Sequence, residues 1–400
     1  MRVLFSALMA AFSVLPSHAE ALSTSEFNQC LTHFDQLAEQ RGVSAQTRQS
    51  LASLQLQARV LELDRSQPEF VQTFPAYFSK RVNAWRIEKG QALLAKHKEF
   101  LTELNEKFGI PAQYLLAFWG LETNFGGYKG TMPTLDSLAT LACDTRRRAF
   151  FTEELLLALQ LVDREGLQPE SMLGSWAGAM GHTQFMPSTY THYAIDGDGD
   201  NHIDLWNSER DALASAANFL AQLGWQPGSR WGREVMLPAD FDYTLAGYQQ
   251  RRSVKAWKAL GLTDTQLAPL PDSELIAVLR VPAGHQGPKF LTYENFGIIM
   301  RWNNSEFYAI AVGHLADRII NGAPLVAPLP EIPALARADV KLMQQQLSAL
   351  GYEVGGADGI IGPATRAGIR QFQADRNLIA DGFPSPSLRD LLNRHTSNQS

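Results

Sequence analysis

One glutamate occurs where a charged side chain is least expected, inside an apolar and aromatic stretch. Glu122 lies in the run WGLETNFG at 119–126. If this run is helical, Glu122 shares a face with Phe118, Trp119 and Phe125. Rings around a carboxyl remove its hydration, which raises its pKa and lets it hold a proton for donation near neutral pH. The pattern predicts a general acid. The alternative is a glutamate at the edge of an amphipathic helix, with its carboxylate in water.

A second segment has the residue types of a sugar-binding surface. The run SWAGAMGHTQFMPS at 175–188 is rich in glycine and alanine, which let a backbone approach a ligand closely. Ser175 and Gln184 offer neutral hydrogen-bonding groups suited to sugar hydroxyl and acetamido groups. Taken alone, the same pattern also fits a seam of closely packed helices.

Acidic residues further along the chain alternate as they do in a calcium-binding loop. The run consists of Asp196, Asp198, Asp200, His202 and Asp204. The match to an EF-hand loop is partial, because Asn201 stands where glycine belongs and Asn207 where the closing glutamate belongs. Glu209 or Asp211 would have to complete the ligand set. The segment fits either a Ca²⁺ site between Asp196 and Asp211 or a turn into a helix with Asp211 as its N-cap.

The composition is that of a soluble globular protein with more than one domain. The chain has 400 residues, of which 45% are hydrophobic, 10% aromatic and 19% charged, and this length predicts two or three domains. The 35 basic and 41 acidic residues give a formal net charge of −6. No block of Lys and Arg is long enough to follow a phosphate backbone, so we expect no nucleic acid partner.

The start of the chain has the pattern of a secretory signal peptide. Residues 1–19 combine a positive start, an apolar stretch and a small-x-small cleavage site. The apolar stretch is too short to span a bilayer, no later segment is long enough, and no cysteine directly follows the cleavage site to carry a lipid anchor. We expect a soluble periplasmic protein without membrane insertion. Cys30 and Cys143 fit either a disulfide or two buried thiols.

Helical patterns dominate the chain up to residue 322. Residues 24–108 are predicted to form an N-terminal lobe of amphipathic helices, and Pro111 opens an apolar helix at 112–125 that Gly126 and Gly127 should end. Further helices are predicted at 146–165, 211–223 and 305–320. Short β-prone stretches lie at 233–237, 275–281 and 289–302. The region is therefore predicted to be mainly α (α+β), with a small β insertion at about 228–302.

A proline-rich run separates this region from a small C-terminal unit. Residues 323–335 suit an extended, semi-rigid linker. Residues 336–395 then carry two Ala-Asp-Gly turns, at 357–359 and 380–382, and each turn leads into a helix. We expect a three-helix module of two related halves. Its predicted core consists of Leu342, Leu347, Leu350, Ile369, Phe372, Leu388 and Leu391.

The motifs, in their order along the chain, resemble those of the lytic murein transglycosylase B family. The resemblance covers residues 25–322 and rests on WGLETNFG, LACDTRRRAFF, SWAGAMGHTQFMPS, DLW with DALASAANFL, and RWNNSEFYAIAVGHLADRI. It implies a lysozyme-like helical catalytic core at residues 20–322. The segment LGYEVGGADGIIGPATRAGIRQFQ resembles small peptidoglycan-binding domains. Both resemblances imply that the partner is a peptidoglycan glycan strand.

The resemblance also implies roles for individual residues. Glu122 matches the family's single catalytic acid/base, and Ser175 and Gln184 match positions that contact the substrate. Asn303 and Tyr308 match the family's Tyr-Asn pair and downstream Tyr. Trp302 stands where the family more often has Tyr, so the stacking surface is kept but the hydrogen bond of the lost hydroxyl is in question.

The reaction that the resemblance implies needs no cofactor. Glu122 would protonate the β-1,4 oxygen between N-acetylmuramic acid and N-acetylglucosamine, and its carboxylate would then accept the proton of the muramyl C6 hydroxyl as a 1,6-anhydro ring closes. The muramyl N-acetyl group would replace the second carboxylate of most glycosidases. The alternatives are a hydrolytic muramidase and a non-catalytic peptidoglycan-binding scaffold, the latter requiring Glu122 to face solvent.

Overall fold

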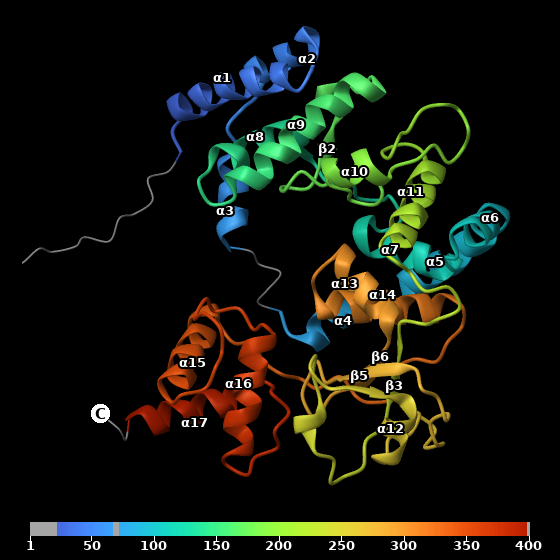
Figure 1. Cartoon of the computed structure of the whole chain (residues 1–400), viewed down its shortest axis with the longest axis vertical. Helices are drawn as coiled ribbons and strands as arrows, with labels where there is room; N and C mark the ends of the chain where they lie inside the picture. The colour runs from blue at the N-terminus through green and yellow to red at the C-terminus, as the bar shows by residue number, and fades with distance from the viewer. Residues whose placement is uncertain (1–21, 67–71, 398–400) are drawn as a thin grey trace, which may run out of the picture.

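The computed structural model describes residues 22–66 and 72–397, and the predicted signal peptide at 1–19 lies outside these ranges. The described chain is mainly helical, with one two-stranded and one four-stranded sheet (Figure 1). Within these ranges no helix combines the length and the apolar character needed to cross a bilayer. This arrangement confirms the predicted fold class of a lysozyme-like helical core with a small β insertion and a C-terminal helical module.

The first group of elements forms the upper part of the molecule in Figure 1. Its members are α1 (Thr24–Gln40), α2 (Ala45–Gln49), α3 (Ala58–Ser66), α8 (Thr134–Cys143), α9 (Arg148–Glu165) and α10 (Pro187–Tyr193), with the short strands β1 (Met132–Pro133) and β2 (Leu173–Gly174). Ser23 begins α1 with a capping box, because its hydroxyl accepts from the Glu26 N–H while the Glu26 carboxylate accepts from the Ser23 N–H. Cys30 and Cys143 form a disulfide that ties α1 to α8.

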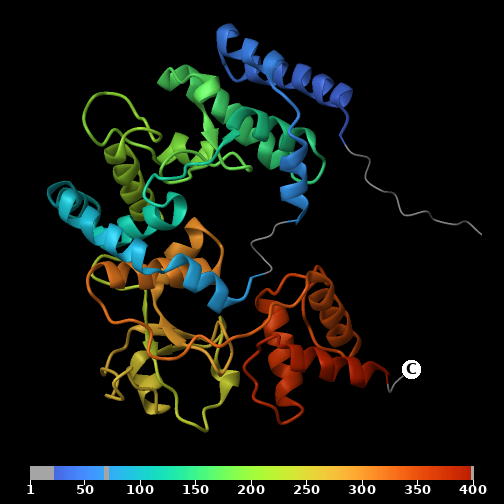
Figure 2. The same ribbon diagram turned by 180° about the vertical axis from the view of Figure 1, so that it is seen from behind.

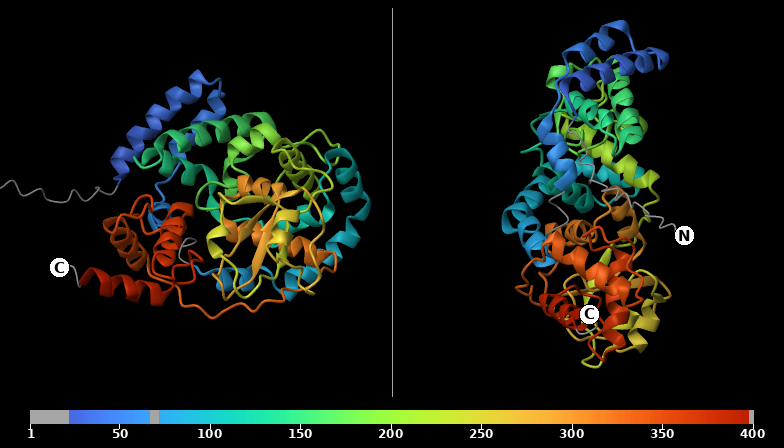
Figure 3. Two further views of the ribbon diagram at one scale, coloured as in Figure 1. Left: turned by 60° about the horizontal axis from the view of Figure 1, so that its bottom comes forward. Right: turned by 90° about the vertical axis from the view of Figure 1, so that its left-hand side faces the viewer.

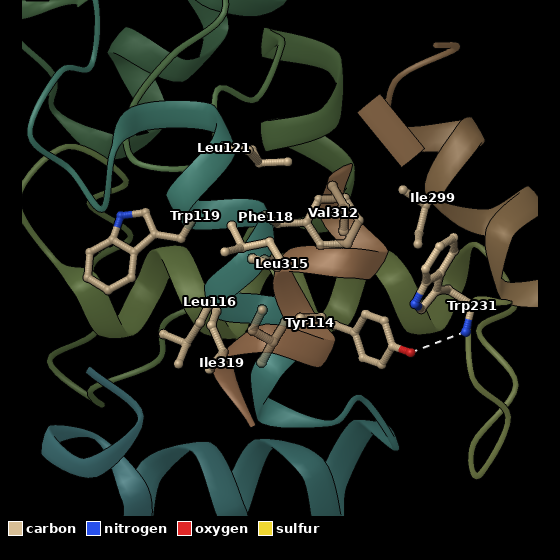
Figure 4. Close-up of a cluster of buried hydrophobic side chains, with 14 of the residues drawn as sticks. Tyr114, Leu116, Phe118, Trp119, Leu121, Trp231, Ile299, Val312, Leu315 and Ile319 are labelled. Carbon is tan, nitrogen blue, oxygen red and sulfur yellow. Dashed lines mark hydrogen bonds between the residues drawn. The ribbon is translucent and has the colours of Figure 1, made fainter. Parts of the chain in front are cut away.

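A second core holds the helices that surround Glu122. It comprises α4 (Phe74–Arg81), α5 (Ala84–Lys96), α6 (Lys98–Phe108), α7 (Ala112–Thr123), α11 (Glu209–Gln222), α13 (Glu294–Trp302) and α14 (Glu306–Ile319). Figure 4 shows side chains of α7 and α14, among them Phe118 and Val312, packed against one another. The Tyr114 hydroxyl accepts a hydrogen bond from the Trp231 N–H at 3.1 Å. Gly313 is required here, because a Cβ would lie 2.1 Å from the Trp231 ring.

Helix α7 ends earlier than the sequence predicts. The helix stops at Thr123, and Asn124 and Phe125 adopt left-handed φ values of 52° and 58° before Gly126. The left-handed turn is stabilised by Arg86, whose Nε donates to the Gly120 carbonyl at 3.1 Å and whose Nη2 donates to the Asn124 side chain. The turn folds the Phe125 ring back over Gly120, where a Cβ would lie 2.7 Å from the ring. The prediction of Phe125 at i+3 beside Glu122 is therefore wrong.

The insertion contains an antiparallel sheet in the order β3-β6-β5-β4. Its elements are β3 (Gly232–Val235), β4 (Arg251–Ser253), α12 (Val254–Ala259), β5 (Ile276–Arg280) and β6 (Lys289–Thr292). The predicted β stretch at 289–302 is wrong after Thr292, where α13 begins and buries Phe296 and Ile299 on one face. This error matters because Trp302 lies at the end of α13.

The C-terminal module consists of α15 (Arg337–Ala349), α16 (Pro363–Ala374) and α17 (Pro386–Ser397). Both Ala-Asp-Gly turns are held by a glutamine on the preceding helix. The Gly359 N–H donates to Gln344 Oε1 and the Gly382 N–H donates to Gln373 Oε1, each at 2.8 Å. The repeated contact supports the two related halves. The predicted core is wrong at Leu342, which is 43% exposed, because its neighbour Met343 faces the interior instead.

The module lies against the sheet insertion (Figures 2 and 3). Asp381, in the second Ala-Asp-Gly turn, accepts hydrogen bonds from the His285 N–H at 2.9 Å and pairs with His285 Nδ1 at 2.7 Å. The linker also follows the protein surface, because the Val326 and Ala327 N–H groups donate to the Glu234 carboxylate. The linker thus joins two units that are in contact.

Replacing Cys30 and Cys143 together by serine should destabilise the fold. The disulfide closes a loop across a sequence separation of 113 residues, so its loss raises the entropy of the unfolded chain. We expect the free energy of unfolding to fall by about 3–5 kcal/mol in denaturant titration. Wild-type protein held in reductant serves as the control and should show the same loss. An unchanged unfolding midpoint in both samples would contradict this expectation.

Candidate active site

Glu122 lies on the last turn of α7 and receives two hydrogen bonds on one carboxylate oxygen. The Tyr308 hydroxyl donates to Oε1 at 2.5 Å, and Trp302 Nε1 donates to the same atom at 2.9 Å. Glu122 Oε2 has no hydrogen-bond partner within the ranges that the structure describes. The two donors therefore fix the carboxyl in place and leave one oxygen for a ligand.

The electrostatics of Glu122 favour the protonated form. Its side chain is half-buried, and loss of hydration raises the pKa of the carboxyl above its ordinary value of 4.5. The hydrogen bonds from Tyr308 and Trp302 and the positive charge of Arg81 act in the opposite direction, but burial outweighs them. The arrangement is suited to an acid that holds its proton and can also exist as a hydrogen-bonded carboxylate.

Trp302 provides both an aromatic surface and the hydrogen bond that the sequence left in question. Its ring packs between aromatic side chains, with centroid distances of 4.4 Å to Phe118, 5.4 Å to Phe185 and 5.2 Å to Phe219. Its indole N–H supplies the hydrogen bond to Glu122, so the lost tyrosine hydroxyl has a substitute. Trp302 therefore provides both a ring and a hydrogen-bond donor at this position.

The predicted aromatic neighbours of Glu122 are only partly right. Phe118 packs against Trp302 beside the carboxyl, as expected. Trp119 instead donates from Nε1 to His182 Nδ1 at 2.9 Å, and the Phe125 ring contacts Trp119 on that other side. The rings that desolvate Glu122 come largely from α13 and α14, distant in the sequence.

His182 anchors the glycine-rich segment to α7. Burial lowers the pKa of His182 to about 4, so the ring is neutral and its Nδ1 accepts from Trp119. Thr123 Oγ1 donates to the His182 carbonyl at 2.8 Å. Gly126 must be glycine because a Cβ would lie 2.3 Å from the His182 ring. These contacts position the segment at 175–188 beside the helix that carries Glu122.

Ser175 and Gln184 are both half-buried and both hold the fold of this segment. Ser175 Oγ accepts from the N–H groups of Ala177 and Ala179, which leaves its own proton without a partner in the described chain. Gln184 has a left-handed φ of 50°, and its Nε2 donates to the carbonyls of Lys129 and Gly181. One hydroxyl proton and one amide oxygen thus stay available for a ligand.

Asn303 and Ser305 lie in the short connection between α13 and α14. Asn303 ends α13 with an exposed side chain. Ser305 caps α14 by accepting from the Tyr308 N–H. This connection sets the relative positions of Trp302 and Tyr308, and therefore of both donors to Glu122.

Arg81 is the residue near the site that the sequence did not reveal. It lies at the end of α4, and its Nη1 donates to the Leu121 carbonyl at 3.2 Å. Its charge acts on the Glu122 carboxyl. An isolated arginine some forty residues upstream carries no local signal, so only the packing of α4 against α7 brings it here.

The acidic loop brings three carboxylates together. One oxygen each of Asp196, Asp198 and Asp211 lie within 4.8 Å of one another. Ser208, not Asp211, is the N-cap of α11, so the prediction of Asp211 as N-cap is wrong. Asp211 is buried, burial raises its pKa, and the charges of Asp198 and Asp196 raise it further. Glu209 turns away and pairs with Lys96.

Two family matches divide the chain as the structure does. The transglycosylase SLT domain matches residues 26–317, and a peptidoglycan binding domain matches residues 336–392. The membrane-bound lytic murein transglycosylase B of Escherichia coli (strain K12) is 33% identical over 244 residues, which make up 61% of this chain and 66% of that relative.

Solved structures resemble most of the chain. SltB3 from Pseudomonas aeruginosa in complex with NAG-anhNAM-pentapeptide is 42% identical, with a TM-score of 0.88 over 92% of this chain and 99% of that one. SltB3 is also solved with NAG-NAM-pentapeptide. Escherichia coli Slt35 in complex with calcium is 29% identical, with a TM-score of 0.64 over 77% of this chain and 99% of that one.

Glu122→Gln should stabilise the protein at neutral pH. Because burial raises the folded-state pKa of Glu122 above 4.5, ionisation of this carboxyl opposes folding once the pH exceeds that value. Glutamine keeps the acceptor oxygen for Tyr308 and Trp302 and removes the charge. We expect a gain of roughly 1.4 kcal/mol in unfolding free energy for each unit of the pKa increase. The gain should vanish below about pH 4.5, as measured by denaturant titrations across pH. A gain that persists in acid would point to a different cause.

Proposed function

The chain belongs to the lytic murein transglycosylase B family, and from this membership we propose that it cleaves the β-1,4 bond between N-acetylmuramic acid and N-acetylglucosamine in peptidoglycan. One observation carries the proposal: burial raises the pKa of the Glu122 carboxyl, and two hydrogen-bond donors hold one of its oxygens. A non-catalytic scaffold would need a solvent-facing Glu122, and the half-buried side chain disagrees with it.

Glu122 serves as both acid and base in this proposal. Its protonated carboxyl gives a proton to the glycosidic oxygen as the bond from that oxygen to the muramyl C1 breaks. The resulting carboxylate takes the proton of the muramyl C6 hydroxyl, whose oxygen bonds to C1 to give a 1,6-anhydro product. Protons balance and no water is consumed. The hydrogen bonds from Tyr308 and Trp302 stabilise the carboxylate between the two steps.

A single carboxylate suffices because the substrate supplies the second group. The groups that act on Glu122 in the described chain are two neutral donors and the cation Arg81, with no second carboxylate among them. The muramyl N-acetyl oxygen is held near C1 by the sugar ring itself and can stabilise the positive charge there. The aromatic packing around Trp302 limits water at the carboxyl and favours capture by the C6 hydroxyl over hydrolysis.

The remaining site residues are assigned to substrate binding. The free proton of Ser175 and the free amide oxygen of Gln184 suit hydroxyl and acetamido groups, and the exposed Asn303 extends this polar surface. The module at 336–395 binds the same polymer and raises the local substrate concentration for the catalytic region at 20–322. With residues 1–19 as signal peptide, the protein would act in the periplasm.

The acidic loop suits a calcium ion that is structural and not part of the reaction. Asp196, Asp198 and Asp211 supply the hard oxygen ligands that Ca²⁺ prefers. Burial is the main cause of the raised pKa of Asp211, and the charges of Asp198 and Asp196 add to it, so a bound cation would relieve the repulsion among the three carboxylates. We assign these three carboxylates to the ion and no cofactor to the chemistry.

Glu122→Gln should abolish cleavage of purified sacculi, since glutamine can neither give nor take the proton. A fall of at least about 10³-fold in turnover is expected, with polymer binding intact. Glu154→Gln is the matched control, because Glu154 is a buried glutamate that accepts from the Ser188 N–H and hydroxyl instead. Appreciable turnover by the Glu122 variant would assign the chemistry to another acid.

Mass spectrometry of the wild-type products should show 1,6-anhydromuramyl ends. A 1,6-anhydromuramyl end has the mass of a hydrolysed, reducing muramyl end minus one water molecule. Reducing muramyl ends would instead identify a hydrolytic muramidase.

Calcium titration by calorimetry should give a saturable binding curve and a rise in melting temperature, because the ion would bind only the folded loop. Asp198→Asn removes one exposed ligand and should weaken binding. Asp200→Asn is the control, since Asp200 is outside the three-carboxylate cluster. A flat trace with the wild type would remove the metal from this loop.

A further inference from the structure

A cleft of about 500 Å³ lies between the sheet insertion and the C-terminal module, away from Glu122. Its polar lining includes Tyr248, Arg280, Glu306, Arg366, Arg370 and Gln371. Arg280 ends strand β5, whereas Arg366 and Arg370 lie one turn apart on α16. The views in Figures 1 and 2 both place α16 on the side of the module that faces the sheet insertion. The cleft exists only where these two units meet.

Arg280 is a buried guanidinium with an unused donor. The residue is only 6% exposed, and its Nη1 has no hydrogen-bond partner among the described residues. Nε donates to Thr292 Oγ1 at 3.3 Å, and the guanidinium carbon lies 3.7 Å from the centre of the Tyr248 ring. Stacking and one hydrogen bond therefore hold the group in position at the cleft, while a buried N–H stays unsatisfied.

Arg370 approaches the same cleft from the module. It reaches between two glycines, because a Cβ on Gly247 would lie 3.3 Å from Nη1 and one on Gly382 would lie 2.9 Å from Nη2. Nη2 donates to the Asp381 carbonyl at 3.3 Å, and the buried Nε has no hydrogen-bond partner in the part of the chain that the structure describes. Arg366, on the next turn of the helix, makes no side-chain hydrogen bond in the described ranges.

Positive charge exceeds negative charge in this cleft. Three arginines face a single carboxylate, that of Glu306, and none of the three forms an ion pair with a described residue. Tyr248, Arg280, Arg366 and Glu306 all line this one cleft. Asp381 lies nearby, but its carboxylate is engaged by His285.

We propose that this cleft binds a carboxylate of the peptides that branch from the glycan strand. The inference rests on the proposed function for the identity of the polymer, and on the unpartnered arginine donors for the site itself. A planar carboxylate matches the paired N–H groups of a guanidinium better than a hydroxyl does. The exposed amides of Gln249 and Gln371 at the rim can pair with peptide groups.

The placement of the site gives it a function that the module alone would not have. A peptide held by Arg280 on one side and by Arg366 and Arg370 on the other contacts both units at once. Binding would therefore favour the docked position of the module, because the ligand has both halves of its site only there. The protein would then distinguish glycan strands that carry peptides from strands that have lost them.

Calorimetry on the full chain tests the site without any turnover. The probes are a synthetic stem peptide with free carboxylates, the same peptide with its carboxylates amidated, and inorganic phosphate. We expect the wild type to bind the free acid at least about tenfold more tightly than the amide. Arg366→Gln and Arg370→Gln should each remove most of that difference. Arg394→Gln, which removes an exposed arginine of α17 outside this cleft, should preserve it.

Three results would overturn the proposal. The first is that the wild type binds the free-acid peptide and the amidated peptide equally tightly. The second is that both cleft variants still prefer the free acid as strongly as the wild type does. The third is that phosphate competes for the site as strongly as the peptide. Arg366→Gln guards against a purely structural effect, because the Arg366 side chain makes no hydrogen bond or ion pair in the described ranges, and the circular dichroism of this variant should match the wild type. Failure of the proposed function would instead appear as absent cleavage by the wild type, whatever the peptide binding.

Discussion

Two hydrogen bonds on one oxygen of Glu122 are the interaction on which the site depends. Without Tyr308 and Trp302, only burial and the charge of Arg81 would act on the half-buried carboxyl, and neither donor would fix its orientation. Burial favours the neutral acid, whereas the two donors favour the carboxylate, so the side chain is suited to both protonation states. A group that must first give and later take a proton needs this balance.

The surrounding fold can be understood as the means of keeping these donors in place. Helix α14 packs along α7 and brings Tyr308 to Glu122, while Ser305 fixes the turn between α13 and α14. On the opposite side, Arg86 stabilises the left-handed end of α7, and Trp119 with Thr123 anchors the glycine-rich segment through His182. Most buried polar groups near the site thus act on its geometry and not on a ligand.

The module adds a second level of organisation. Its repeated glutamine-to-glycine contacts make it a compact unit, yet the Asp381 and His285 pair and the charged cleft join it to the sheet insertion. A proline-rich connection would permit separation of the two units. The observed contacts show instead that the linker runs along the surface, held by Glu234.

The sequence by itself determined the helical class, the position of Glu122 among apolar and aromatic residues, the two-part organisation and the repeated turns, because these depend on local periodicity, spacing and turn chemistry. It misplaced Phe125 and Trp119 around Glu122, since a left-handed turn held by Arg86 lies outside any helical pattern. It also extended a strand through α13, because apolar residues near Ile299 fit either period. Only the tertiary structure decided which rings and donors contact Glu122, and that Arg81 lies near it. It also decided that Cys30 and Cys143 are paired. Each of these features depends on contacts between segments that are distant in the chain.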